Sequence, residues 1–210
     1  MNCIKGVLLL VLMALLVACS NKTADLEAFY KQLDEANKNE KQIVKASENL
    51  EKLENTKLQL FNKVNKAKAD QMNGLADDLI KNTNERKQIA EKESIAMGKS
   101  KQIFEASKKD AKAIADKTQK KHVEKLVIVL EDKYAKHESM MNSYHEILIK
   151  ELDLFNYLKE DVIDKKLVNK KIAALSKLYE KFQLKTDDYT KTTRDVEQVK
   201  KPIVKTLNEA

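Results

Sequence analysis

Apolar residues recur at steps of three and four along the chain from Thr23 to its C-terminal end. This spacing keeps one face of an α-helix apolar while the charged residues on the other faces meet water. Long amphipathic helices are not stable alone in water, so we expect them to pack against one another. The clearest stretches carry Leu26, Phe29, Leu33, Leu50 and Phe61 near the start, and Ile172, Leu175, Tyr179, Val196, Ile203 and Leu207 near the end.

The apolar stripe is weak in the second quarter of the chain and strong in the third. The weak stretch carries Leu75, Leu79, Ile89, Ala96, Ile103 and Ile114, whereas the strong one carries Val123, Val127, Leu130, Tyr134, Met141, Tyr144, Leu148 and Phe155. Both keep the helical period, so we predict helix throughout.

Turn signals in the chain are faint. Asn73-Gly74 is the best candidate for a first reversal, residues 161–164 for the last, and residues 117–121 for one between them. These divide the chain into four helices of about 40 to 47 residues, each roughly 60–70 Å long. Breaks at Asn55-Thr56 and Met97-Gly98 would give a different partition. The prediction is all-α: a long antiparallel up-and-down four-helix, coiled-coil-like bundle over residues 25–208.

Two local features need an interpretation within this plan. The run at residues 126–130 has the composition of a strand, but no second such run is available to pair with it. We therefore interpret it as the most buried turn of the third helix. Pro202 lies inside the last stripe, where it is expected to kink the helix or to begin a final short segment.

The N-terminal segment has the features of an export signal. Lys5 precedes twelve apolar residues, which as a helix would span only about 18 Å of a hydrocarbon core about 30 Å thick. The tetrapeptide Leu16-Val17-Ala18-Cys19 resembles the bacterial lipobox. By that resemblance residues 1–18 are a signal peptide, Cys19 receives a diacylglyceryl group carrying fatty acids such as palmitate, and residues 19–24 form a short tether.

Cysteine usage and charge fit an exported protein. Cys3 lies in the removed segment, so Cys19 is the only thiol of the mature chain and no internal disulfide can form. Loss of Lys5 leaves 39 basic against 33 acidic residues, a net charge of +6. Only Arg86 and Arg194 are arginines, so the positive charge comes almost entirely from lysine. Lysine attracts a polyanion as a point charge and lacks the rigid guanidinium that binds a phosphate or carboxylate with two parallel hydrogen bonds.

One cluster, formed by His137, Tyr144 and His145, could carry chemistry. The two histidines lie about 12 Å apart along a helix, whereas a helix binds a metal through residues three or four apart. We interpret them as one partly buried and one exposed histidine. Motifs for nucleophilic catalysis and for phosphate binding are absent from the sequence, so we expect no enzyme, no catalytic residue, no metal and no cofactor.

Lysine clusters are the remaining candidates for a site. Those singled out as possible polyanion-binding residues are Lys117, Lys120, Lys121, Lys165, Lys166, Lys170 and Lys171. The alternative is a mixed, solvated surface, because acidic residues interrupt most of the clusters. Nucleic acid is not an expected partner, since the interleaved aromatic residues of single-strand binders are missing.

The chain resembles the YkyA-like family of cell-wall-binding lipoproteins of Gram-positive bacteria. The resemblance rests on the lipobox and on the lysine- and glutamate-rich helical body from Asp25 to Leu207. The resemblance implies a four-helix bundle on the outer face of the cytoplasmic membrane, held there by lipid on Cys19. It implies a non-enzymatic role, with cell-wall polymer such as teichoic acid or peptidoglycan as partner. The alternative is a helical interaction module that docks a membrane or wall-synthesis protein.

Overall fold

The structure is a computed structural model that describes residues 23–209 as four long helices, with no strand among those residues. Helix α1 covers Ala24–Val64, α2 covers Ala69–Ala113, α3 covers Lys117–Tyr157 and α4 covers Lys165–Glu209. Their lengths are 41, 45, 41 and 45 residues, which confirms the predicted division into four helices of nearly equal length.

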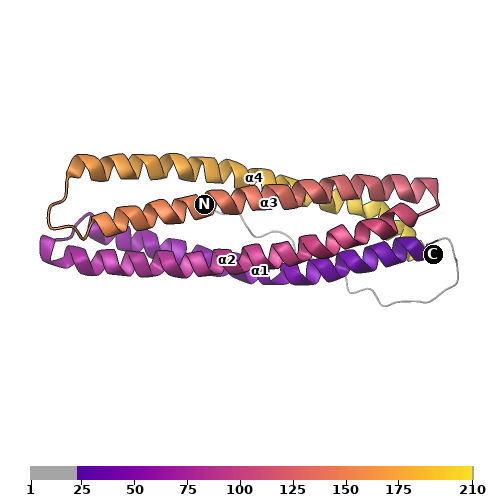
Figure 1. The fold of residues 1–210 in the computed structure, drawn as a ribbon, viewed down its shortest axis with the longest axis horizontal. Coiled ribbons are helices and arrows are strands. Elements are labelled where there is room, and N and C mark those ends of the chain that lie inside the picture. Colours follow the sequence, from indigo (N-terminus) through magenta and orange to yellow (C-terminus); the bar gives the residue numbers. More distant parts are fainter. Residues whose placement is uncertain (1–22, 210) are drawn as a thin grey trace.

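The helices form an antiparallel up-and-down rod in which each packs mainly against its neighbours in the chain (Figure 1). A rise of 1.5 Å per residue makes the helices about 60 to 70 Å long. The start of α1, the end of α4 and the α2–α3 turn lie at one end of the rod, which we call the terminal end. The α1–α2 and α3–α4 turns lie at the other end, the far end.

The turns are short and only partly match the predictions. The last turn occupies residues 158–164, as predicted, and the backbone N–H of Asp164 donates to the hydroxyl of Tyr157 at 2.9 Å. The middle turn occupies residues 114–116, a few residues before the predicted position. Its Asp116 carboxylate accepts from the backbone N–H groups of Thr118 and Gln119, so it caps α3.

The predicted first reversal at Asn73-Gly74 is wrong, because both residues lie inside α2. The chain turns earlier, at residues 65–68, a segment without glycine or proline. A helix tolerates an exposed glycine at a cost of about 1 kcal/mol, so Gly74 does not end α2. The alternative breaks at Asn55-Thr56 and Met97-Gly98 also lie inside helices.

The run at residues 126–130 is helical, as predicted, but it is not buried throughout. Leu126 and Leu130 face the core, whereas Ile128 between them is 63% exposed. Helix α4 continues through Pro202 to Glu209, so the proline does not begin a separate segment.

Two apolar clusters fill the rod along its length. The cluster nearer the terminal end draws Leu26, Phe29, Phe104, Leu126 and Ile203 from all four helices. The cluster nearer the far end is built mainly from α2, α3 and α4, with Leu79, Leu148, Phe155 and Leu175 buried in it. Burial of these side chains is the main force that holds the helices together.

A group of charged side chains is buried beside the second cluster. Arg86 of α2 is fully buried, and its guanidinium pairs with Glu54 of α1 at 2.7 Å and with Glu151 of α3. The same guanidinium donates to Asn82 and Thr83 on its own helix. One side chain therefore links three helices.

Lys57 completes this group and extends it to α4. Its ammonium is 3.1 Å from Glu151, pairs also with Glu54, and donates to the hydroxyl of Tyr179. The Tyr144 hydroxyl donates to Glu54 at 2.7 Å. Two cations thus face two carboxylates, and this balance makes possible the burial of Lys57, Arg86 and Glu151 and the partial burial of Glu54. We call these residues the Arg86 cluster: Glu54, Lys57, Asn82, Thr83, Arg86, Tyr144, Glu151 and Tyr179.

The Arg86 cluster shifts the pKa values of its members in opposite directions. Burial by itself raises the pKa of Glu54, but the adjacent ammonium of Lys57 and guanidinium of Arg86 outweigh it, and the pKa lies below the usual range. Burial and the nearby carboxylates raise the pKa of Tyr144 and Tyr179, so both phenols stay protonated and act as donors.

We predict that Arg86→Ala lowers the free energy of unfolding by about 3–5 kcal/mol, because it leaves the buried Glu151 and the half-buried Glu54 with Lys57 as their single cation. Urea unfolding followed by circular dichroism measures this. Arg194→Ala is the matched control, since Arg194 is the chain's other arginine and is exposed; its effect should stay within about 0.5 kcal/mol. Equal unfolding midpoints for the two variants would contradict the prediction.

We also predict that the bundle loses stability in acid. A carboxyl whose pKa is lowered by folding binds fewer protons in the folded than in the unfolded state. The stability contributed by Glu54 is therefore complete above the ordinary pKa of 4.5 and is lost as the pH falls through its lowered folded value. Between about pH 7 and about pH 3, the melting temperature should fall less steeply for Glu54→Gln than for Glu35→Gln. Glu35→Gln is the control, because Glu35 forms an exposed ion pair. Identical declines would show that Glu54 does not cause the loss.

Candidate polyanion-binding surfaces

The three residues singled out as a possible catalytic or metal cluster lie in separate environments. His137 is buried, with its Nε2 atom 3.0 Å from a carboxylate oxygen of Glu93 and its ring edge-on to Tyr189. Tyr144 belongs to the Arg86 cluster. The Nε2 atom of His145 is buried and has no hydrogen-bond partner in residues 23–209. The structure therefore does not bring these side chains together around a shared site.

The buried and half-buried carboxylates at the helix interfaces are bonded within the bundle. Besides the Arg86 cluster, Glu40 of α1 pairs with Lys133 of α3 and accepts from the Ser100 hydroxyl at 2.7 Å. Within residues 23–209 no group of three histidine, cysteine, aspartate or glutamate side chains is placed to hold a metal ion.

The predicted lysines fall into two groups at opposite ends of the rod (Figure 1). Lys117, Lys120 and Lys121 lie in the first turns of α3, at the terminal end. The group 165–171 begins α4, at the far end. About 60 Å of helix separates the two groups, so they cannot form one continuous binding surface.

Most of these lysines are available to an outside partner. Lys117, Lys121, Lys165, Lys166 and Lys170 are exposed and Lys120 is half-buried, and none of the six forms an ion pair with a carboxylate of the described chain. Lys171 differs, because it pairs with Asp153 of α3 and lies over the ring of Tyr157.

The far end carries a further basic feature that the sequence reasoning missed. A hollow of about 450 Å³ lies at the α1–α2 turn and is lined by Asn62, Lys63, Lys66, Ala67, Gln71 and Leu75. It contains two ammonium groups and two carboxamides but no carboxylate. The close spacing of Lys63, Lys66 and Lys68 was visible in the sequence, but the misplaced first turn put these residues inside a helix.

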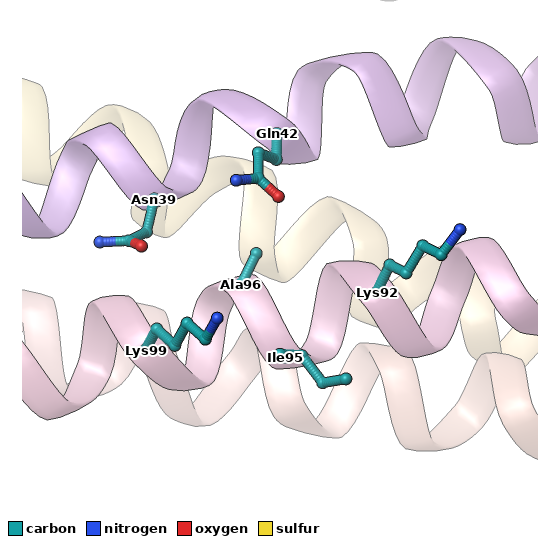
Figure 2. A pocket seen from close by; sticks show the side chains of 6 residues that line it. All are labelled: Asn39, Gln42, Lys92, Ile95, Ala96 and Lys99. Carbon is teal, nitrogen blue, oxygen red and sulfur yellow. The ribbon is translucent and has the colours of Figure 1, made fainter.

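A second, smaller groove of about 170 Å³ lies between α1 and α2 near the middle of the rod (Figure 2). Asn39 and Gln42 extend into it from α1, and Ala96 points toward them from α2. Lys92 and Lys99 flank Ala96 along α2, and Ile95 lies beside them with 59% of its surface exposed. This lining also lacks a carboxylate.

Acidic side chains near the basic groups are partly occupied by local bonds. Asp164, at the start of α4, accepts from the backbone N–H of Lys166 at 2.8 Å, and Lys159 pairs with Asp77. Glu160 and Asp161 remain exposed in the α3–α4 turn. The far end therefore carries basic residues on α4 and at the α1–α2 turn, and exposed acidic residues in the α3–α4 turn.

Cys19 and the signal segment lie outside the described residues. Over residues 23–209 no helix has the length and the apolar character needed to cross a bilayer.

Comparison with known proteins identifies relatives over nearly the whole chain. A family model described as "Putative cell-wall binding lipoprotein" (YkyA) matches residues 24–206. The protein named "Uncharacterized lipoprotein YkyA" of Bacillus subtilis (strain 168) is 24% identical over 194 residues, which cover 88% of this chain and 87% of the relative. A crystal structure of a conserved protein of unknown function from Staphylococcus aureus superposes with a TM-score of 0.76 at 28% identity, and the match covers 90% of this chain and 97% of the other.

These matches confirm the resemblance seen in the sequence and the four-helix fold that it implies. A lipoprotein family places its members on the outer side of a membrane, so the extracellular setting follows at the level of the family. The chain belongs to the YkyA lipoprotein family.

Proposed function

We propose that this protein is a non-enzymatic envelope lipoprotein, anchored by lipid on Cys19, whose helical rod binds an anionic polymer of the cell wall. The family description supports the wall as the setting. The lipobox-like sequence ending at Cys19 supports the anchor. A binding role also fits a rod whose buried acidic side chains, Glu93 and Glu151, are bonded within the bundle.

The observation that carries this proposal is the set of unpaired lysines at the far end. No carboxylate of the described chain forms an ion pair with these lysines, which are Lys165, Lys166 and Lys170 on α4, and Lys63 and Lys66 in the hollow at the α1–α2 turn. Ammonium groups spread over two turns match a flexible chain of phosphates, which supplies charges at many positions and needs no rigid docking geometry.

Carboxamides strengthen this interpretation of the far end. Asn62 and Gln71 line the same hollow as Lys63 and Lys66, and each amide can both donate and accept hydrogen bonds. In a wall polymer that carries hydroxyl groups between its phosphates, the hydroxyls would bind the carboxamides and the phosphates would bind the lysines. The groove at Asn39, Gln42, Lys92 and Lys99 offers the same chemistry midway along the rod.

We predict that the protein is retained on purified cell walls and that salt releases it. Each lysine that neutralises a phosphate releases a counterion, so the logarithm of affinity falls linearly with the logarithm of salt concentration. Replacing Lys165, Lys166 and Lys170 by glutamine should weaken retention at low salt and make the slope shallower by about 2. Co-sedimentation with walls over a salt series measures both quantities.

The control for this experiment removes the same charge from paired lysines. Lys38, Lys101 and Lys136 each face a carboxylate on the surface, so their replacement by glutamine should leave retention close to that of the parent protein. Walls stripped of their anionic polymer should retain neither protein. Retention that is insensitive to salt and to the α4 replacements would contradict polyanion binding and would favour docking to a wall-associated protein.

We further predict that Cys19→Ser releases the protein from the membrane fraction after a high-salt wash. The mature chain has no other thiol for acylation, and two or more acyl chains are needed for stable anchoring. Metabolic labelling with a fatty-acid analogue should mark the parent protein and leave the variant unmarked. A variant that remains equally membrane-bound would show that another segment holds the chain.

A further inference from the structure

The terminal end of the rod carries the first described residue of α1 together with the α2–α3 turn (Figure 1). Only four residue steps separate Cys19 from Thr23, and these span at most about 14 Å. If Cys19 is acylated, as the proposed function requires, the terminal end lies within about 14 Å of the membrane surface. The far end then lies some 60 Å further along the rod when the rod stands upright.

The α2–α3 turn presents a dense basic segment at this same end. Residues 108–121 contain six lysines and two aspartates. Lys108 is neutralised by Glu105 and Glu131. The remaining five, which we call the tip lysines, form no ion pair within the described chain: Lys109, Lys112, Lys117, Lys120 and Lys121.

The two aspartates of this segment are occupied. Asp116 accepts the backbone N–H groups that begin α3, and Asp110 accepts from the side chain of Gln32 on α1. Elsewhere at the terminal end, the acidic residues Asp25, Glu27 and Glu209 are offset in part by Lys201 and Lys205. The excess positive charge is therefore concentrated on the α2–α3 turn.

We propose that the tip lysines dock onto phosphate headgroups of the anionic lipids in the membrane that holds the anchor. The positive charge of the tip lysines complements the negative charge of such a membrane. An anionic surface attracts cations within a layer about 8–10 Å thick. The short stretch between Cys19 and Thr23 holds the α2–α3 turn close to this layer. Wall polymer is the less suitable partner for these lysines, because the membrane already faces this end of the rod.

Docking gives the rod a second point of contact with the membrane. The acyl chains hold the start of α1 only, and a rod attached at a single point can swivel through all angles. A second contact, on the turn between α2 and α3, restricts the tilt and directs the far-end lysines away from the bilayer. The two lysine groups found in the sequence thus bind different partners.

The test measures the reactivity of individual lysines in the acylated protein reconstituted into vesicles. One set of vesicles contains phosphatidylcholine alone and the other contains equal parts of phosphatidylcholine and phosphatidylglycerol. An amine-acylating reagent modifies exposed lysines, and mass spectrometry gives the rate at each position. Lys165, Lys166 and Lys170 serve as an internal control, because they lie at the far end of the same molecule.

We expect the tip lysines to react about fivefold more slowly on the anionic vesicles than on the neutral ones, and high salt to abolish the difference. The far-end lysines should react at the same rate on both. Equal rates at the tip on both vesicles would overturn the proposal. Slowing at both ends of the rod would also overturn it, because the rod would then lie flat.

A variant separates docking from mere closeness to the membrane. Replacing Lys117, Lys120 and Lys121 by glutamine should remove most of the protection of Lys109 and Lys112, because docking is cooperative across the turn. Protection that persists unchanged would show that the tether alone causes it. The vesicles contain no wall material, so this outcome is independent of wall retention.

Discussion

The bundle depends on the electrostatic balance around Arg86, which ties α1, α2 and α3 together at one level of the rod. Three buried charges and the half-buried Glu54 lie within reach of one another, and each buried charge would cost several kcal/mol without its partners. Apolar stripes alone allow long helices to slide by a turn with little loss of buried surface. A buried guanidinium that needs carboxylates from two other helices removes this freedom, so the network fixes the register that apolar packing leaves loose.

The same network explains why α2 gave the weakest pattern in the sequence. The buried positions of this helix include Asn82, Thr83, Arg86, Glu93, Ser100 and Ser107, all polar. Apolar periodicity detects only the apolar part of a buried face, so Leu79, Ala96 and Ile114 were predicted to face the core and the polar buried positions were not. Arg86 did leave a signal, as one of two arginines among forty basic residues, although its burial could not be inferred from that count.

The fold was predictable to the extent that its helices are long, equal and amphipathic. The first turn was not, because residues 65–68 contain no residue that requires a turn and Gly74, which seemed to require one, is accommodated in helix. The lysine clusters could likewise be found in the sequence, whereas their placement at opposite ends follows only from the order of the helices. Topology, and not residue type, divides them into two surfaces.

Packing between chain neighbours also bears on how the molecule folds. Because α1 contacts mainly α2, α2 contacts α3 and α3 contacts α4, most contacts join residues close in the chain. Proteins with such low contact order fold quickly, and a first helical hairpin can form before the rest of the chain is present. Closure of the ion network must wait for Glu151, which is 65 residues beyond Arg86. An emerging chain would therefore pass through a stage in which Arg86 has Glu54 of α1 within reach but not yet Glu151 of α3.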